Sequence, residues 1–150
     1  IPYFVDFKYI LNQSEAGKKA QQTLKNKLDS GIKKIQEKEK NIQEEEKKII
    51  QQKKVISQEE YVKKVNDLRK KVSSLQDERN SLLEKISKDR AKARNELLKS
   101  LNPIIENYMQ EKKIRLVFDK KNIILADQKL DITKEIMEVL NTKLKSIKLN

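Results

Sequence analysis

The sequence predicts a mostly α-helical α+β fold, in which a long antiparallel helical hairpin, a coiled-coil arm, is joined to a small β body completed by oligomerisation. Charged residues make up 39% of the 150 residues, and only two glycines and two prolines interrupt the chain, which is typical of long exposed helices. So polar a chain could also be disordered, but its apolar residues recur at helical spacing. Short apolar segments near both ends read as strands.

The N-terminal segment IPYFV, residues 1–5, predicts a short strand that ends at Asp6. Pro2 is tolerated at the start of a strand or on an edge. A short helical turn over residues 8–11 follows. Asn12 with Glu15 has the form of a capping box, and Ser14 offers a looser start for the next helix.

Residues 15–54 predict one long helix with a thin apolar stripe. A seven-residue repeat defines one seam position of a coiled coil: Leu28, Ile35, Ile42, Ile49 and Ile56. The companion position is mostly polar, with Leu24 followed by Gly31, Lys38, Glu45 and Gln52. A stripe this thin needs a partner helix.

The second helix supplies that partner. A capping box at Ser57-Gln58-Glu59-Glu60 marks the break and places the tip near residues 53–60. The seam then advances by steps of four and three, through Tyr61, Val65, Leu68, Val72, Leu75, Leu82 and Ile86, with Arg79 as an interruption. Pro103 is expected to kink the helix or mark the passage from arm to body. One continuous helix of nearly a hundred residues is the alternative.

The seven-residue repeat also predicts a register for the hairpin. Antiparallel pairing suits residue numbers that sum to about 110 or about 117, and the capping box favours 110. Five facing pairs then join apolar residues: Ile49 with Tyr61, Ile42 with Leu68, Ile35 with Leu75, Leu28 with Leu82, and Leu24 with Ile86. Three others are half polar: Glu45 with Val65, Lys38 with Val72, and Gly31 with Arg79. Such an arm, about 60 Å long at 1.5 Å per residue, should bend easily.

The C-terminal third predicts a β-hairpin and a closing helix. Residues 114–119 and 123–126 read as strands around a turn at 120–122. An amphipathic helix follows, with Thr133 as its N-cap. Residues 1–14 and 104–150 would form the oligomerisation body, and residues 15–103 the arm.

Three short strands leave exposed apolar edges, which are a hazard unless they are paired. Copies from other chains would remove those edges, so the body is expected to build an oligomer. The residues expected to serve this contact are Tyr3, Val5, Leu116, Val117, Phe118, Ile123, Ile124 and Leu125.

The sequence offers no signal for catalysis. It has no cysteine or histidine, no glycine-rich phosphate loop and no zinc or EF-hand spacing, so we expect no enzyme, no metal, no cofactor and no small-molecule substrate. The carboxylate run Glu44-Glu45-Glu46 reads as a solvated helix face. No apolar run of membrane-spanning length occurs. A start at Ile1 fits a mature form after signal-peptide removal or a trimmed chain.

The net charge of +12 is concentrated near the tip. Half of it falls between residues 47 and 72, where three acidic residues accompany nine basic ones: Lys47, Lys48, Lys53, Lys54, Lys63, Lys64, Arg69, Lys70 and Lys71. A basic tip attracts acidic or anionic partners. The accompanying apolar contacts would come from Val55, Ile56, Tyr61 and Val62. The alternative is a lysine-rich coiled-coil surface in which Tyr61 packs within the hairpin.

Two stretches of this sequence resemble the Skp/OmpH family of periplasmic chaperones. The first is "VDF" followed by "NQSEAGKKA", from Val5 to Ala20. The second runs from Val117-Phe118-Asp119 through Ala126-Asp127 to Leu130-Asp131-Ile132-Thr133. The helical middle also fits, although many coiled coils would match it.

The resemblance implies a homotrimer with a small β-barrel body and three helical tentacles around a cavity. It implies an ATP-independent holdase that binds unfolded outer-membrane proteins in the periplasm of a Gram-negative bacterium. Lipopolysaccharide or an anionic lipid surface is a further partner of some members, assigned here to no residue. Two rival functions stay open. A nucleic-acid binder would suit the charge, but acidic residues are interspersed and stacking aromatics are lacking. A coiled-coil scaffold with a fixed folded partner is the other.

Overall fold

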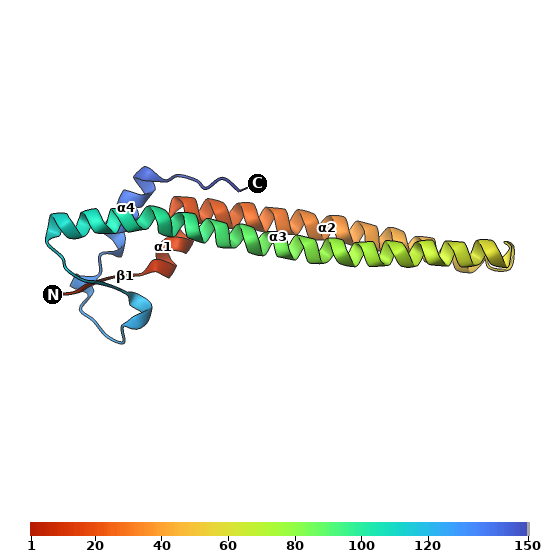
Figure 1. Cartoon of the computed structure of the whole chain (residues 1–150), viewed down its shortest axis with the longest axis horizontal. Coiled ribbons are helices and arrows are strands. Elements are labelled where there is room, and N and C mark those ends of the chain that lie inside the picture. The colour runs from red at the N-terminus through yellow and green to blue at the C-terminus, as the bar shows by residue number, and fades with distance from the viewer. Residues whose placement is uncertain (150) are drawn as a thin grey trace. The chain divides into compact units, whose positions relative to one another are not determined.

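The computed structural model describes residues 1–149 and confirms a mostly helical α+β fold with long helices and a small strand pair (Figure 1). The elements are β1 (Tyr3–Val5), α1 (Phe7–Gln13), α2 (Glu15–Gln52), α3 (Gln58–Lys112), β2 (Val117–Asp119) and α4 (Thr133–Lys143), with 3-10 turns at Lys120–Asn122 and Gln128–Leu130. The chain divides into two compact units. We call residues 1–24 with 88–150 the core unit, and residues 25–87 the hairpin unit.

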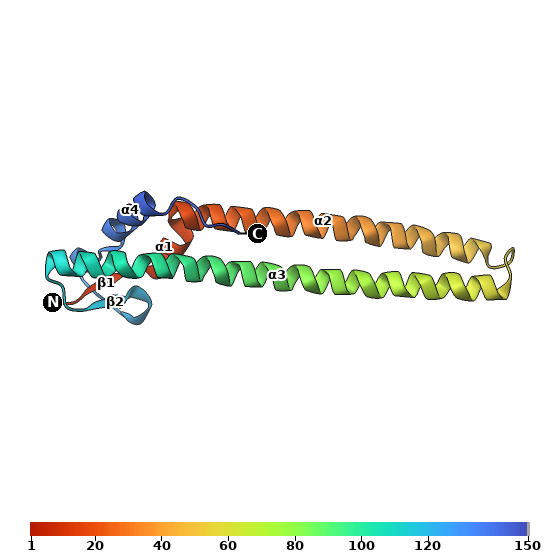
Figure 2. The ribbon, with the colours of Figure 1, turned by 45° about the horizontal axis from the view of Figure 1, so that its top comes forward.

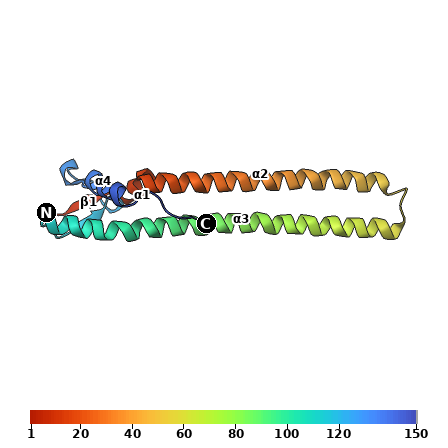
Figure 3. The same ribbon diagram turned by 90° about the horizontal axis from the view of Figure 1, so that it is seen from above.

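Within the hairpin unit, α2 and α3 run antiparallel side by side and are joined by residues 53–57 (Figures 2 and 3). The predicted seam is buried at Ile35, Ile49, Leu75 and Ile86. It is not buried at Val72, whose side chain is 52% exposed, so that part of the seam prediction was wrong.

The predicted register of the hairpin was also wrong. Side chains pair between Lys38 and Glu78 and between Glu45 and Lys71, whose residue numbers sum to 116 in both cases. The prediction had set Lys38 and Glu45 opposite valines. Side chains on a helix lean toward the N-terminus of that helix. In an antiparallel pair, two side chains in contact therefore come from residues whose numbers add up to more than those of two residues whose backbones lie side by side. The observed register lets polar residues of the two helices bond to each other.

The predicted β-hairpin at residues 114–126 does not form, and residues 123–126 are not a strand. Strand β2 pairs instead in parallel with β1, with Phe4 opposite Phe118, and Phe4 also forms a bridge to Asp131 (Figure 2). Local bonds explain the difference. The Asp119 carboxylate accepts from the Lys121 N–H at 3.3 Å, and the Ile123 N–H donates to the Lys120 carbonyl at 3.0 Å. These bonds make a 3-10 turn rather than a two-stranded return.

The apolar centre of the core unit gathers residues from both ends of the chain and from α3. Its fully buried large side chains include Val5, Ile10, Leu101, Ile136 and Leu140. Ala16, Leu97 and Leu101 also pack in this centre, which lies in the compact unit of residues 1–24 and 88–150. The expected division into an oligomerisation body and an arm, with bounds at 14/15 and 103/104, stays a prediction. Pro103 lies inside α3, which continues to Lys112.

Hydrogen bonds tie the first strand to the last helix. The Asp6 N–H donates to the Thr133 Oγ1 at 2.9 Å, and the Ile132 N–H donates to the Phe4 carbonyl at 3.0 Å. The Thr133 N–H donates to the Asp131 carboxylate at 2.9 Å. Thr133 is therefore the first residue of α4 and not its N-cap as predicted, since its hydroxyl is used by Asp6 and Asp131 satisfies the N–H.

The turn between α1 and α2 requires glycine at position 17. Ser14 ends α1, and its Oγ accepts from the Gly17 N–H at 3.1 Å, which starts α2. A Cβ at position 17 would lie 2.0 Å from the Leu11 carbonyl oxygen and 2.9 Å from the Ser14 Oγ. The backbone of Leu11 cannot move away without disrupting α1.

We predict that Gly17→Ala lowers the free energy of unfolding by about 3 kcal/mol, because overpacking against backbone forces the turn apart. Urea denaturation followed by circular dichroism measures this. Gly31→Ala is the matched control. Its Cβ would meet the Leu82 side chain, with both methyl groups at 2.7 Å and the Cγ at 3.2 Å. This side chain is flexible, unlike the Leu11 backbone, and alanine favours a helix interior by about 1 kcal/mol, so the net change should be small. Equal losses in the two variants would contradict this account.

Helix α3 ends in a left-handed residue that is not glycine. Lys113 has φ 56°, and the Ile114 N–H donates back to the Met109 carbonyl at 2.8 Å, as in a Schellman motif.

We predict that Lys113→Gly stabilises the chain by about 1 kcal/mol, because glycine adopts this conformation without the cost that a Cβ imposes. Lys112→Gly, at the last residue of α3, should give no such gain, because the φ of this residue is not positive. Thermal unfolding of the two variants beside the unmodified chain gives the comparison, and a loss of stability in Lys113→Gly would refute the prediction.

Candidate functional site

The hairpin tip is built by short local bonds. The Val55 and Ile56 N–H groups both donate to the Gln52 carbonyl, at 2.9 and 3.1 Å, and close the end of α2. Ser57 then caps α3, because its Oγ accepts from the Glu60 N–H at 3.2 Å. The capping-box sequence predicted this start of α3. A turn this short fixes where the side chains of residues 53–57 emerge.

Three of the nine basic residues expected at the tip bind within the hairpin itself. The Lys64 ammonium donates to Gln52 Oε1 at 2.8 Å, and the Lys71 ammonium pairs with Glu45 at 2.8 Å. The Lys53 ammonium lies 5.4 Å from the centre of the Tyr61 ring, within cation–π range. The remaining six are exposed: Lys47, Lys48, Lys54, Lys63, Arg69 and Lys70.

The four apolar residues expected at the tip divide in the same way. Val55 is 83% exposed and Val62 is 46% exposed, so both can contact another molecule. Ile56 and Tyr61 are half-buried. The end of the hairpin therefore carries six exposed cations and two accessible valines, and we call these eight residues, the six cations with Val55 and Val62, the tip cluster.

A second candidate surface lies in the core unit, at β2 and the loop after it. Leu116, Phe118, Ile124 and Leu125 are all exposed, and Ile124 and Leu125 are almost fully so. Tyr3, Val117 and Ile123 are half-buried. Val5 is fully buried in the chain's own centre, so its side chain is closed to a second chain and its expected contact role is corrected. The four exposed residues are named the β2 patch.

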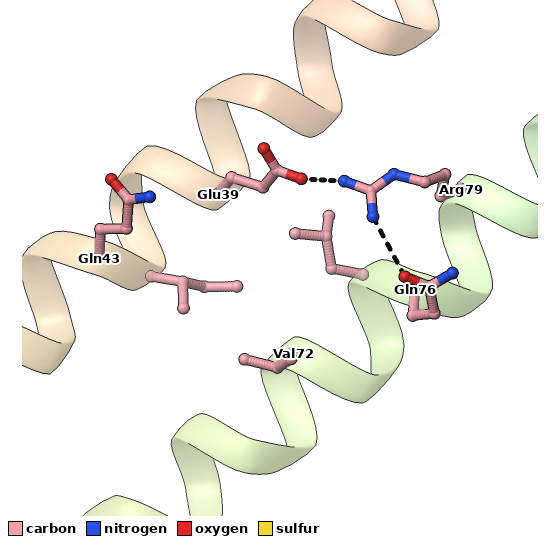
Figure 4. Close-up of a pocket in the computed structure, with 7 residues that line it drawn as sticks. Glu39, Gln43, Val72, Gln76 and Arg79 are labelled. Carbon is pink, nitrogen blue, oxygen red and sulfur yellow. Dashed lines mark hydrogen bonds and ion pairs between the residues drawn. The ribbon is translucent and has the colours of Figure 1, made fainter.

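Two grooves run along the hairpin unit between its helices. Figure 4 shows the first, whose lining includes Gln43 of α2 and Val72 and Gln76 of α3. An ion pair between Glu39 and Arg79 lies at one end of it, and Arg79 also donates to Gln76 Oε1 at 3.1 Å. The second groove is lined mainly by polar side chains, among them Lys34, Lys38, Ser74, Glu78 and Lys85.

Several apolar residues between the tip and the core unit are exposed, and this exposure was not predicted from the sequence. Ile32 and Ile50 of α2 and Leu83 of α3 join Val72 in this group. The signal was present as a second row of uncharged residues beside the seam of α3, at steps of three and four.

Two other kinds of functional feature, a metal-binding group and a membrane-spanning helix, are not found among the described residues. Residues 1–149 contain no group of three or more acidic, cysteine or histidine side chains placed to hold a metal ion. Across the same residues, no helix combines the length and apolar character needed to cross a membrane. Burial, with smaller contributions from Glu135 and Tyr3, raises the pKa of Tyr108, so this phenol stays protonated at neutral pH.

We predict that Ser57→Ala lowers the stability of the hairpin unit by about 1 kcal/mol, because the first turn of α3 loses its side-chain acceptor. Ser74→Ala, an exposed change within the same helix, should be neutral or slightly stabilising. Thermal unfolding followed by circular dichroism distinguishes them, and an unchanged midpoint for Ser57→Ala would show that the cap is dispensable.

Comparisons with known proteins agree with this fold. A solved structure described as an OmpH-like outer membrane chaperone, from Caulobacter crescentus, superposes with a TM-score of 0.93. Its sequence is 19% identical, and the match covers 99% of this chain and 88% of that one. No curated protein matches the sequence. The family model "Outer membrane protein (OmpH-like)" matches residues 3–140, and the chain therefore belongs to the OmpH-like family.

Proposed function

We propose that this protein is an ATP-independent holdase chaperone, which binds unfolded outer-membrane β-barrel proteins and prevents their aggregation in the periplasm of a Gram-negative bacterium. The observation that carries the proposal is the tip cluster, which combines six exposed cations with two exposed valines. Membership of the OmpH-like family and the fold shared with an outer membrane chaperone support it.

The physical basis is weak and distributed binding. A holdase must shield apolar segments of its client without fixing one structure, because transiently exposed apolar surface leads to aggregation. Exposed cations attract acidic clients over a distance of about 10 Å at 0.1 M salt, and this attraction needs no energy source. Apolar side chains beside those cations then supply short-range contacts. The structure offers both kinds of group at the tip.

We further propose that the chain acts as a homotrimer assembled through the β2 patch. Among the described residues, β2 pairs with β1 in a two-stranded sheet. Leu116, just before β2, and Phe118, within it, are both exposed. Exposed apolar residues beside a strand edge favour pairing with another chain. The number three comes from the family resemblance.

Reversing charge at the tip should weaken client binding. We predict that a variant with Lys47, Lys48, Lys54 and Lys63 all changed to Glu binds a urea-denatured β-barrel client about tenfold more weakly at low salt, because long-range attraction is lost. The difference should shrink at high salt. A fluorescence-anisotropy titration of labelled client measures the affinity.

A matched control carries the same change in net charge on the core unit, with Lys8, Lys18, Lys129 and Lys134 changed to Glu. These lysines are also exposed. This control should bind almost as the unmodified chain does. Equal weakening in both variants would assign the effect to net charge and not to the tip cluster.

The native mass tests assembly and role together. We expect light scattering to give a mass near three chains, which rises by one client when denatured β-barrel protein is added. A single-chain mass that does not respond to client would contradict both proposals. Binding of duplex DNA in preference to client would favour a nucleic-acid role instead.

A further inference from the structure

The two long faces of the hairpin unit differ in charge. On one flank of the α3 seam, positions spaced by three or four residues are uncharged apart from Arg69: Val62, Val65, Val72, Gln76, Asn80 and Leu83. We call these six residues the α3 stripe. On the other flank the corresponding positions are mostly charged, and they include Lys64, Asp67, Lys71, Glu78 and Lys85. In a chain with 39% charged residues, so neutral a row calls for an explanation.

The α3 stripe is open to solvent except at Val65, which is half-buried. Val62, Val72 and Leu83 are 46%, 52% and 55% exposed. Ser74 follows Val72 by two residues, which is about 200° around a helix, and it lines the second groove rather than the first. The two grooves therefore lie on opposite faces of the hairpin, and the α3 stripe borders the first (Figure 4).

The opposite face is already engaged with itself. Lys38 and Glu78 pair across the helices at 2.7 Å, and Lys71 and Glu45 pair at 2.8 Å. Lys64 reaches Gln52 on the same side of α3. Charged groups that are paired and hydrated make a poor surface for an apolar segment, because they would have to lose water.

The charge of the α3 stripe indicates its occupant. One unpaired cation, Arg69, is too little to hold an anionic lipid or a nucleic acid, and Arg79 beside the stripe is neutralised by Glu39. Exposed valine and leucine side chains suit apolar side chains of an unfolded polypeptide. The Gln76 and Asn80 amides can bond to peptide groups that such a polypeptide leaves free. Isolated exposed apolar residues are common, but here three of them share one flank of a helix with the neutral amides Gln76 and Asn80, which suits an interaction surface.

We propose that the α3 stripe is the surface along which the hairpin holds apolar segments of an unfolded polypeptide, and that the opposite, ion-paired face stays free of it. This proposal rests on the holdase function and gives it a face and a set of residues that share only Val62 with the tip cluster.

Single cysteines in this cysteine-free chain test the assignment. Val72→Cys and Leu83→Cys place a dye on the α3 stripe, while Ser74→Cys and Ser81→Cys place it on the ion-paired face. Quenching by acrylamide, a neutral quencher that ignores the charge difference between the faces, reports the exposure of each dye. Urea-denatured β-barrel client should reduce quenching several-fold at positions 72 and 83 and leave it almost unchanged at 74 and 81.

Light scattering on the same mixtures separates the possible failures. Client bound with equal shielding at all four positions, or with none, overturns the α3 stripe while the holdase function stands. No bound client overturns both. Shielding at positions 72 and 83 that grows with protein concentration in the absence of client means that a second copy covers the stripe, and this also overturns the proposal.

A pair of substitutions measures the energetic share of the α3 stripe. Changing Val72 and Leu83 together to Gln should raise the dissociation constant for client about tenfold, since apolar contacts are lost at the binding surface. Changing Ser74 and Ser81 together to Gln is the control and should leave it unchanged. Circular dichroism confirms that both variants keep their helices. Unchanged affinity in the first variant overturns the proposal.

Discussion

The pairing of β1 with a strand more than a hundred residues later is the constraint on which the rest of the structure depends. Each strand has only three residues, so the ladder alone could not hold them together. The bond from Asp6 to Thr133 and the burial of Val5 with Ile136 and Leu140 reinforce it. The chain between β1 and β2 must return to its starting point for the two strands to pair. An antiparallel arrangement of α2 and α3 achieves this return. Contacts so distant in sequence are also slow to form.

The hairpin meets this requirement with little apolar material. Its seam is buried at a few positions such as Ile35 and Leu75, and other apolar seam residues such as Ile42 are only half-buried. Exposed ion pairs such as Lys38 with Glu78 contribute at most about 1 kcal/mol each. They act on register more than on stability, because a slip of one helix along the other would separate several pairs at once. Thin packing also leaves apolar side chains of α3 free for other contacts.

Periodicity and capping residues predicted the helices well. Ser57 and Glu60 fixed the start of α3, and the heptad isoleucines fixed the buried side of α2, because both signals act within a few residues. The register was mispredicted, since backbone level alone ignores the lean of long side chains such as Lys38 and Lys71. The strand at 123–126 was mispredicted because apolar composition cannot reveal that Asp119 closes a local turn. At the tip, the cations could be predicted from the sequence, but not which of them would bond within the hairpin. Val72 was wrongly predicted to be buried in the seam.

The loop that carries Ile124 and Leu125 lies between two 3-10 turns, each with an aspartate as its N-cap. Asp119 and Asp127 each accept a backbone N–H two residues ahead and thereby close a 3-10 turn before and after the loop. Two aliphatic side chains therefore stand in water on a backbone whose shape is set in the single chain. Docking onto this loop would lose little conformational entropy, since the ordering has already taken place during folding. Preorganisation of this kind strengthens association, because neither partner has to refold on binding.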